Sequence, residues 1–227
     1  MSTVSKQAFE FLQDIKQNNN KPWFQKNKSR YETIKTGMEA FAEDVLQQMN
    51  EVDVIETPSG KKSLFRIYRD VRFSKDKTPY KTHFSGYLRR AGADRRGGYF
   101  FHIAPGDSYI AGGFFAPDAK DLLHIRKQIQ ADPELLRKEL AKKPFKQHFG
   151  RLLGSQLKTA PKGFDKEDAN IDLLRYKQYY VEHSFTDKEV LSKDFAQQVA
   201  KGFAAMIPFF DCMTEYLTTD LNGESLL

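Results

Sequence analysis

The sequence of 227 residues contains a single cysteine, Cys212, and no apolar run that approaches the ~20 residues of a membrane-spanning helix. One cysteine excludes an intrachain disulfide framework and fits a reducing compartment. The first residues, Met-Ser-Thr-Val-Ser-Lys, soon turn polar and do not resemble a signal peptide. We therefore expect a cytoplasmic protein that makes no membrane contact.

Several motifs of familiar enzyme classes are also missing. The chain has no Gly-x-x-x-x-Gly-Lys-Ser/Thr loop, which excludes a P-loop nucleotide fold, and its paired glycines lack Rossmann spacing. It has no His-Glu-x-x-His motif and no paired cysteines. The histidines His83, His102 and His183 are scattered, so we expect no metal site. Nothing in the sequence identifies a cofactor.

Apolar residues at helical spacing predict helices at both ends of the chain. They indicate one helix over 6–17, a long second helix from Pro22 to Met49, and shorter helices over 117–130 and 133–142. A capping box at 186–189 precedes a closing helix that bends or restarts at Pro208.

The middle of the chain is typical of antiparallel strands. Turn residues separate strands expected over 53–57, 63–72, 82–90, 98–104 and 108–115, with a last strand within 173–186. The links are too short for crossover helices. We therefore expect an α+β fold: a meander of about five to six strands, with N- and C-terminal helices packed on one face. No repeat or linker divides residues 1–227, so we expect a single domain with an ordered core of about 5–218.

The net charge of +6 has a local origin. Residues 61–96 contain 12 Lys or Arg against 3 Asp, whereas the rest of the chain has more acidic than basic residues. A basic excess confined to one segment indicates a surface that attracts anions.

Within this segment, arginines recur at every third position and a turn follows. With Phe65, Ile67, Val71 and Phe73 facing the core, alternation places Arg66, Tyr68, Asp70 and Arg72 on the opposite face. His83, Ser85 and Tyr87 would extend that face from the next strand, and Phe100 and His102 from the one after it. Arg69 falls on the apolar side, which a bulge, a strand end or an ion pair would explain.

Guanidinium and ammonium groups at this density suit an oxyanion or a phosphate. We expect a ligand site with Asp70 or Asp76 as the candidate general base, although a solvated, ion-paired face would also account for the pattern. The predicted ligand-binding residues are Trp23, Arg66, Tyr68, Arg69, Arg72, Lys75, Lys77, Tyr80, Lys81 and His83.

Three kinds of partner fit this segment. An anionic small molecule or nucleotide is favoured, nucleic acid bound through residues 61–96 is the first alternative, and an acidic protein partner is the second. The sequence leaves open whether the protein is an enzyme and what its oligomeric state is.

The run from Arg66 to Thr82, RIYRDVRFSKDKTPYKT, resembles the signature of the family of domain of unknown function 2461. Similar elements are the stretch from Asn18 to Phe24, the pair Gly112-Gly113 before Pro117, and the stretch 161–164. The resemblance covers roughly residues 8–217, with Phe115-Ala116 where the family usually has Trp or a similar residue. It implies a single-domain bacterial or fungal protein, supports the site assignment and supplies no reaction.

Overall fold

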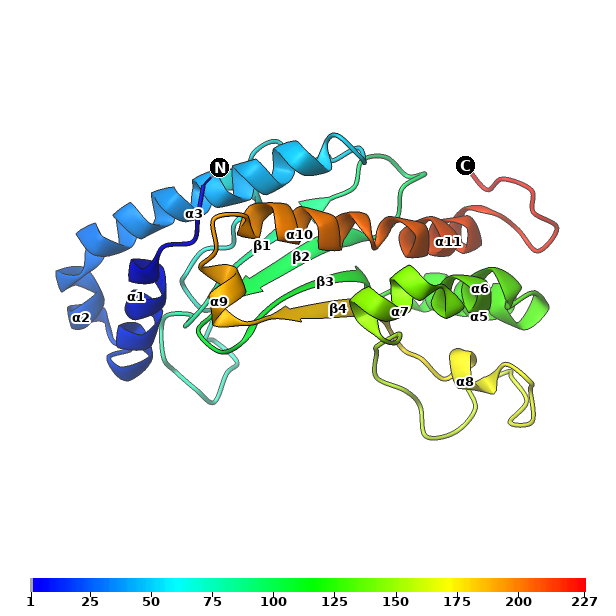
Figure 1. Ribbon diagram of the computed structural model, residues 1–227. Helices are drawn as coiled ribbons and strands as arrows, with labels where there is room; N and C mark the ends of the chain where they lie inside the picture. Colours follow the sequence, from blue (N-terminus) through cyan, green and yellow to red (C-terminus); the bar gives the residue numbers. More distant parts are fainter. Residues whose placement is uncertain (1) are drawn as a thin grey trace. The chain divides into compact units, whose positions relative to one another are not determined.

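The computed structural model describes residues 2–227 (Figure 1). Its helices are α1 (Lys6–Gln17), α2 (Lys21–Lys26), α3 (Lys28–Met49), α4 (Gly60–Ser63), α5 (Ala119–Ala131), α6 (Glu134–Ala141), α7 (Lys143–Phe149), α8 (Ile171–Leu174), α9 (Asp187–Val190), α10 (Phe195–Ala204) and α11 (Ile207–Thr218). Its strands are β1 (Phe84–Arg89), β2 (Gly98–Ile103), β3 (Ser108–Phe114) and β4 (Tyr179–Phe185). Within residues 2–227, no helix has both the length and the apolar character that a membrane crossing requires.

The fold is α+β, with one antiparallel sheet in the order β1-β2-β3-β4 and helices around it. The prediction of five to six strands was wrong, because 53–57 and 63–72 do not form strands of the sheet. The second segment makes isolated bridges, Leu64 to Gly86 and Tyr68 to Tyr80. The Arg69 N–H donates to the Pro79 carbonyl at 2.9 Å. Proline has no N–H to return the bond, so the ladder stops there.

By its internal contacts the chain divides into two compact units, each assembled from separate stretches. The first contains the chain up to Leu88, Phe100–Ile110 and Ser184–Lys201, and the second contains Arg89–Tyr99, Ala111–His183 and Gly202–Leu227. The single domain expected from the sequence stays a prediction.

Aromatic rings form the core of the first unit. Phe41 of α3 lies edge-on to Phe101 of β2, with ring centroids 5.7 Å apart, and stacks on Phe195 of α10 at 5.4 Å. Phe11 of α1 lies 5.9 Å from Tyr31 of α3. These five rings are buried, so hydrophobic burial holds α3 against β2 and α10, and α1 against α3.

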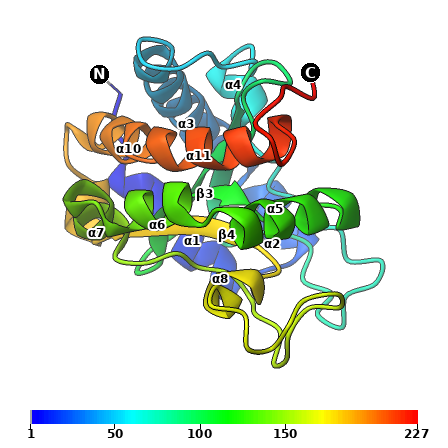
Figure 2. The ribbon, with the colours of Figure 1, turned by 90° about the vertical axis from the view of Figure 1, so that its right-hand side faces the viewer.

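The second unit has a core of its own. Tyr99 of β2 lies 5.1 Å from the rings of both Phe203 and Phe210. A Cβ at Gly112 of β3 would lie 2.5 Å from Met206 Sδ and 2.6 Å from the Phe210 ring, so a larger residue there would displace these core side chains. Helix α11 contacts α5 and α6, which lie beside it in Figure 2.

The helix predictions are mostly confirmed. α1 has the predicted bounds, Thr186 and Glu189 form the expected capping box of α9, and the closing helix is divided into α10 and α11 next to Pro208. The predicted long second helix is interrupted at Asn27, which ends α2 and begins α3. Helices α7 and α8 lie in segments that the sequence analysis did not assign to helices.

The contact between α4 and α3 provides a test of close packing. A Cβ at Gly60 would lie 2.2 Å from the Glu43 backbone nitrogen, and the Gly60 N–H donates to the Glu43 carboxylate at 2.6 Å. We expect Gly60→Ala to lower the free energy of unfolding by about 2 kcal/mol or more in urea titrations. The control is Gly37→Ala in the exposed part of α3, where nothing lies within 4 Å. It should raise stability by about 1 kcal/mol. A Gly60→Ala protein as stable as the parent would contradict the packing.

Candidate functional site

The basic motif folds as an excursion of the chain before β1, which we call the motif loop (residues 64–83). Its two arms run antiparallel: the Lys81 N–H donates to the Ile67 carbonyl at 2.7 Å, and the first arm continues toward β1 through the bond from Phe65 N–H to Ser85 O at 2.9 Å. Ile67 and Tyr80 are the buried residues of this loop, at 2% and 3% exposure. The predicted pairing of the two arms through the turn is therefore present, without a regular strand.

The predicted inward orientation of Phe65 and Phe73 was wrong. Phe65 is 49% exposed and Phe73, near the tip of the motif loop, is 97% exposed. Strict alternation over 65–73 would need a strand that continues through Arg69 and Asp70, whereas the chain leaves extended pairing after Arg69. Beyond that residue, period-two spacing no longer tells which side chains face the core.

Asp76 organises the turn of the motif loop. Its carboxylate accepts bonds from the Thr78 N–H at 2.9 Å, the Thr78 hydroxyl at 3.0 Å and Arg69 Nη1 at 2.5 Å. These bonds, the Thr78 backbone bond foremost, lower the pKa of Asp76 to about 2. The ion pair accounts for Arg69 on the apolar side of the predicted strand. A carboxylate of such low basicity serves as a hydrogen-bond acceptor and accepts a proton poorly.

Asp70 and Arg72 form a second, more exposed ion pair. Arg72 Nη2 lies 2.6 Å from Asp70 Oδ2, and Arg72 Nε lies 3.0 Å from Oδ1. The Arg72 side chain is the main reason why the pKa of Asp70 is lowered. The Arg72 side chain is 77% exposed, so solvent screens this pair and it contributes little to stability. Both candidate bases are thus ionised partners of arginines.

Two other cations of the motif loop are not neutralised in this way. Arg66 is exposed, and within residues 2–227 neither Arg66 nor Lys81 forms an ion pair. Lys81 is half-buried, with Nζ 5.3 Å from the centroid of the Phe65 ring. Burial first, and then the charge of Arg66, lower the pKa of Lys81. Positive charges that repel each other favour a bound anion.

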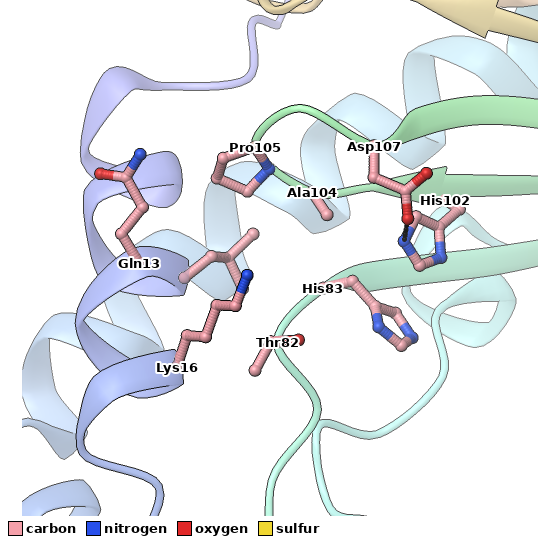
Figure 3. A pocket seen from close by; sticks show the side chains of 9 residues that line it. Gln13, Lys16, Thr82, His83, His102, Ala104, Pro105 and Asp107 are labelled. Atoms are coloured by element: carbon pink, nitrogen blue, oxygen red, sulfur yellow. Dashed lines mark ion pairs between the residues drawn. The ribbon is translucent and has the colours of Figure 1, made fainter.

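His83 and His102 form a half-buried imidazole pair with ring centroids 4.2 Å apart. Asp107 Oδ2 lies 3.8 Å from His102 Nε2 (Figure 3). Burial, the neighbouring His102 and Lys81 lower the pKa of His83 to about 4. Burial also lowers the pKa of His102, and Asp107 opposes that shift. At neutral pH both imidazoles are therefore uncharged and can donate or accept a hydrogen bond.

Two cavities have His83 of this pair in their lining, and His102 lines the first of them. The first, of about 300 Å³, lies between α1 and the ends of the strands and is lined by Leu12, Gln13, Lys16, Thr82, His83, His102, Ala104, Pro105 and Asp107 (Figure 3). The second, of about 390 Å³, is lined by Asn19, Arg69, Asp70, Asp76, Thr78, Tyr80, Lys81, Thr82 and His83. Because Thr82 and His83 line both, we describe the two cavities together as the histidine cleft.

The turn between α1 and α2 holds the motif loop in place. The Asn19 side chain donates to the Tyr80 carbonyl at 2.9 Å and accepts from the Tyr80 N–H at 3.0 Å. The Tyr80 ring stacks on Phe24 with centroids 4.1 Å apart. One asparagine thus satisfies both backbone groups of the residue that precedes Lys81, and it fixes one wall of the histidine cleft.

The structure brings together part of the predicted site. Six predicted residues line the histidine cleft: Arg69, Asp70, Asp76, Tyr80, Lys81 and His83. Trp23 packs on Phe11 at 5.8 Å instead, Tyr68 packs on Phe24 and Tyr80, and Lys77 donates to the Val71 carbonyl at 2.9 Å. Arg66, Arg72 and Lys75 are exposed and are not among the residues that line the two cavities.

Sequence reasoning missed Lys16, Asn19, Thr82 and Asp107 as cleft residues. Lys16 occupies the last turn of an amphipathic helix, where lysine is common. The Asn18-Asn19-Asn20 run is a visible helix-stop signal, but nothing in it distinguishes the asparagine that caps α2, Asn20, from the one that binds Tyr80. Among the described residues, no group of three or more His, Cys, Asp or Glu side chains is arranged to hold a metal ion.

Residues 7–212 match the family described as a conserved hypothetical protein, DUF2461. The chain belongs to this family. No curated protein and no solved structure matches it. The family assignment brings no activity with it, so the function has to be argued from the histidine cleft.

Removing the Asn19 amide should loosen the motif loop. Asn19→Ala leaves the Tyr80 N–H and carbonyl without these partners, and we expect a loss of about 1–3 kcal/mol in the free energy of unfolding. Gln17→Ala, at an exposed position that lines neither cavity, is the control and should change stability by less than about 0.5 kcal/mol. Equal stability of the two variants in urea titrations would show that the Asn19 bonds do not hold the loop.

Burial of neutral His83 should make stability depend on pH. Its pKa is lower in the folded than in the unfolded chain, so between about pH 4 and 6.5 the unfolded state binds more protons. The free energy of unfolding should therefore fall as pH drops through this window, by an amount on the order of 1–3 kcal/mol from His83. Urea titrations should show a shallower pH dependence for His83→Gln. An unchanged slope would contradict the burial.

Proposed function

We propose that this protein binds an anionic small molecule, with a phosphate or carboxylate group, in the histidine cleft. The observation that carries the proposal is that two cavities share Thr82 and His83 in their lining, and that Lys16 lines one cavity and Lys81 the other. Neither lysine has an ion pair within residues 2–227. Volumes of about 300 and 390 Å³ suit a small molecule.

The charges of the cleft divide into two groups with different tasks. Arg69 is satisfied by Asp76, and Arg72 by Asp70, so the carboxylates in the second cavity are already neutralised. The remaining charges are the cations Lys16 and Lys81, with Arg66 nearby, and the carboxylate of Asp107 in the first cavity, so the cleft keeps a net positive charge. Of the three arginines predicted to bind the ligand, only Arg66 keeps that role, together with Lys16 and Lys81. Arg69 instead holds the turn of the motif loop through Asp76.

The imidazole pair supplies hydrogen bonds that suit an oxyanion. Neutral His83 can donate one N–H to a bound oxygen, and the negative charge of that oxygen would stabilise the imidazolium form. Binding of the anion should then raise the pKa of His83 from its low value. The same proton exchange is what a general acid or base needs, so any catalysis at this site would involve the histidines and not Asp70 or Asp76.

Calorimetric titration with pyrophosphate tests the proposal. We expect saturable binding at millimolar or lower concentration, weakened at least about tenfold in Lys81→Ala and Lys16→Ala because each removes a cation from the cleft wall. Lys75→Ala is the matched control, since Lys75 is exposed and outside both cavities. Equal weakening in all three variants would mean diffuse attraction to a basic surface. Absence of saturable binding by the parent protein to pyrophosphate, phosphate and simple carboxylates would refute the proposal.

A further inference from the structure

A row of aromatic and imidazole rings lies beside the histidine cleft. We call it the ring row: Phe65, Phe100, Tyr109, His102 and His83. Successive centroids lie 6.4 Å apart from Phe65 to Phe100, 6.0 Å to Tyr109, 4.8 Å to His102 and 4.2 Å to His83. All five residues belong to the first unit.

The ring row lies on the sheet face opposite the core. Along β2, Phe101 and Ile103 are each 1% exposed, whereas the alternating residues Phe100 and His102 are half-buried. Tyr109 on β3 is half-buried as well, and Phe65 is 49% exposed. The rings therefore keep part of their surface accessible. Phe65 and Phe100, whose planes are inclined to each other by 44°, each leave ring surface on which a flat aromatic group can stack.

The ring row borders the cationic residues of the histidine cleft at both of its ends. His83 ends the row and lines both cavities. At the other end, Lys81 Nζ lies 5.3 Å from the centroid of the Phe65 ring. A single ligand that reaches Lys81 with an anionic group is thus adjacent to aromatic surface. A ligand with an anionic end and a flat aromatic end fits both features.

We propose that the anion bound in the histidine cleft is a nucleotide, whose phosphate is held by Lys81 and Lys16 and whose base stacks on the ring row at Phe65 and Phe100. This assignment rests on the proposed function and adds the chemical class of the ligand. Cavity volumes of about 300 and 390 Å³ favour a mononucleotide over a polymer. Stacking recognises the flat surface of a base more than its edge, so purines should bind more tightly than pyrimidines.

Calorimetry with AMP, UMP, ribose 5-phosphate and inorganic phosphate tests the ligand class. We expect AMP to bind about tenfold or more tightly than ribose 5-phosphate, from the stacking of its base, and UMP to bind between the two. Phe100→Leu should bring AMP affinity down to that of ribose 5-phosphate and leave phosphate affinity unchanged. Phe100→Tyr should retain AMP binding. Phe73→Leu, at an exposed ring outside the row, is the matched control and should behave as the parent.

The outcomes separate this assignment from the proposed function. If ribose 5-phosphate binds as tightly as AMP and Phe100→Leu has no effect, the nucleotide is refuted while the anion site stands. If neither phosphate, pyrophosphate nor AMP binds, the anion site itself is refuted. A single-stranded tetranucleotide should bind no more tightly than AMP. Binding of the tetranucleotide more than tenfold tighter would overturn the mononucleotide in favour of a nucleic-acid surface.

Discussion

The two hydrogen bonds between the Asn19 side chain and the Tyr80 backbone are the constraint on which the candidate site depends. The motif loop has little regular pairing of its own: it makes two isolated bridges and buries Ile67. Asn19 joins the second arm to the turn between α1 and α2. That attachment creates the wall of the second cavity, and it places Lys81 and His83 in the histidine cleft.

The charged residues of the motif loop fall into two groups: those at the turn form ion pairs, and those nearer the sheet do not. At the turn, the charge of Arg69 is balanced by Asp76 and the charge of Arg72 by Asp70. The bonds of Asp76 to Arg69 and Thr78 hold the turn together. Closer to the sheet, Lys81 lies beside Arg66 without a carboxylate, next to an imidazole pair that burial keeps neutral. Positive charge next to half-buried, uncharged hydrogen-bond donors favours a bound anion, because the anion takes the place of the water that burial removes from these groups. The basic excess of the sequence therefore separates into scaffold and binding charge once the contacts are known.

Local signals in the sequence predicted most of the helices and the approximate positions of β1, β2, β3 and β4, because helix caps and alternation are written in neighbouring residues. The failures have a common physical origin. Phe65 and Phe73 looked like core residues because the strand period was extended through Arg69, where pairing opposite Pro79 ends. The sequence analysis missed Lys16 and Asn19 as cleft residues for a related reason, because each is ordinary in its own helix context. Only tertiary contact brings them to the motif loop.

The central claim is that an anion binds beside His83 and His102. The most direct measurement is the imidazole spectrum of the isotope-labelled protein, followed by nuclear magnetic resonance during titration with pyrophosphate at several pH values. We predict that at each pH the His83 and His102 signals shift with added ligand and reach saturation, and that the pKa of His83 rises when the ligand is bound. The signals of His124, His148 and His183 should not shift when ligand is added at constant pH. Unmoved His83 and His102 signals, or equal movement of all five, would contradict it.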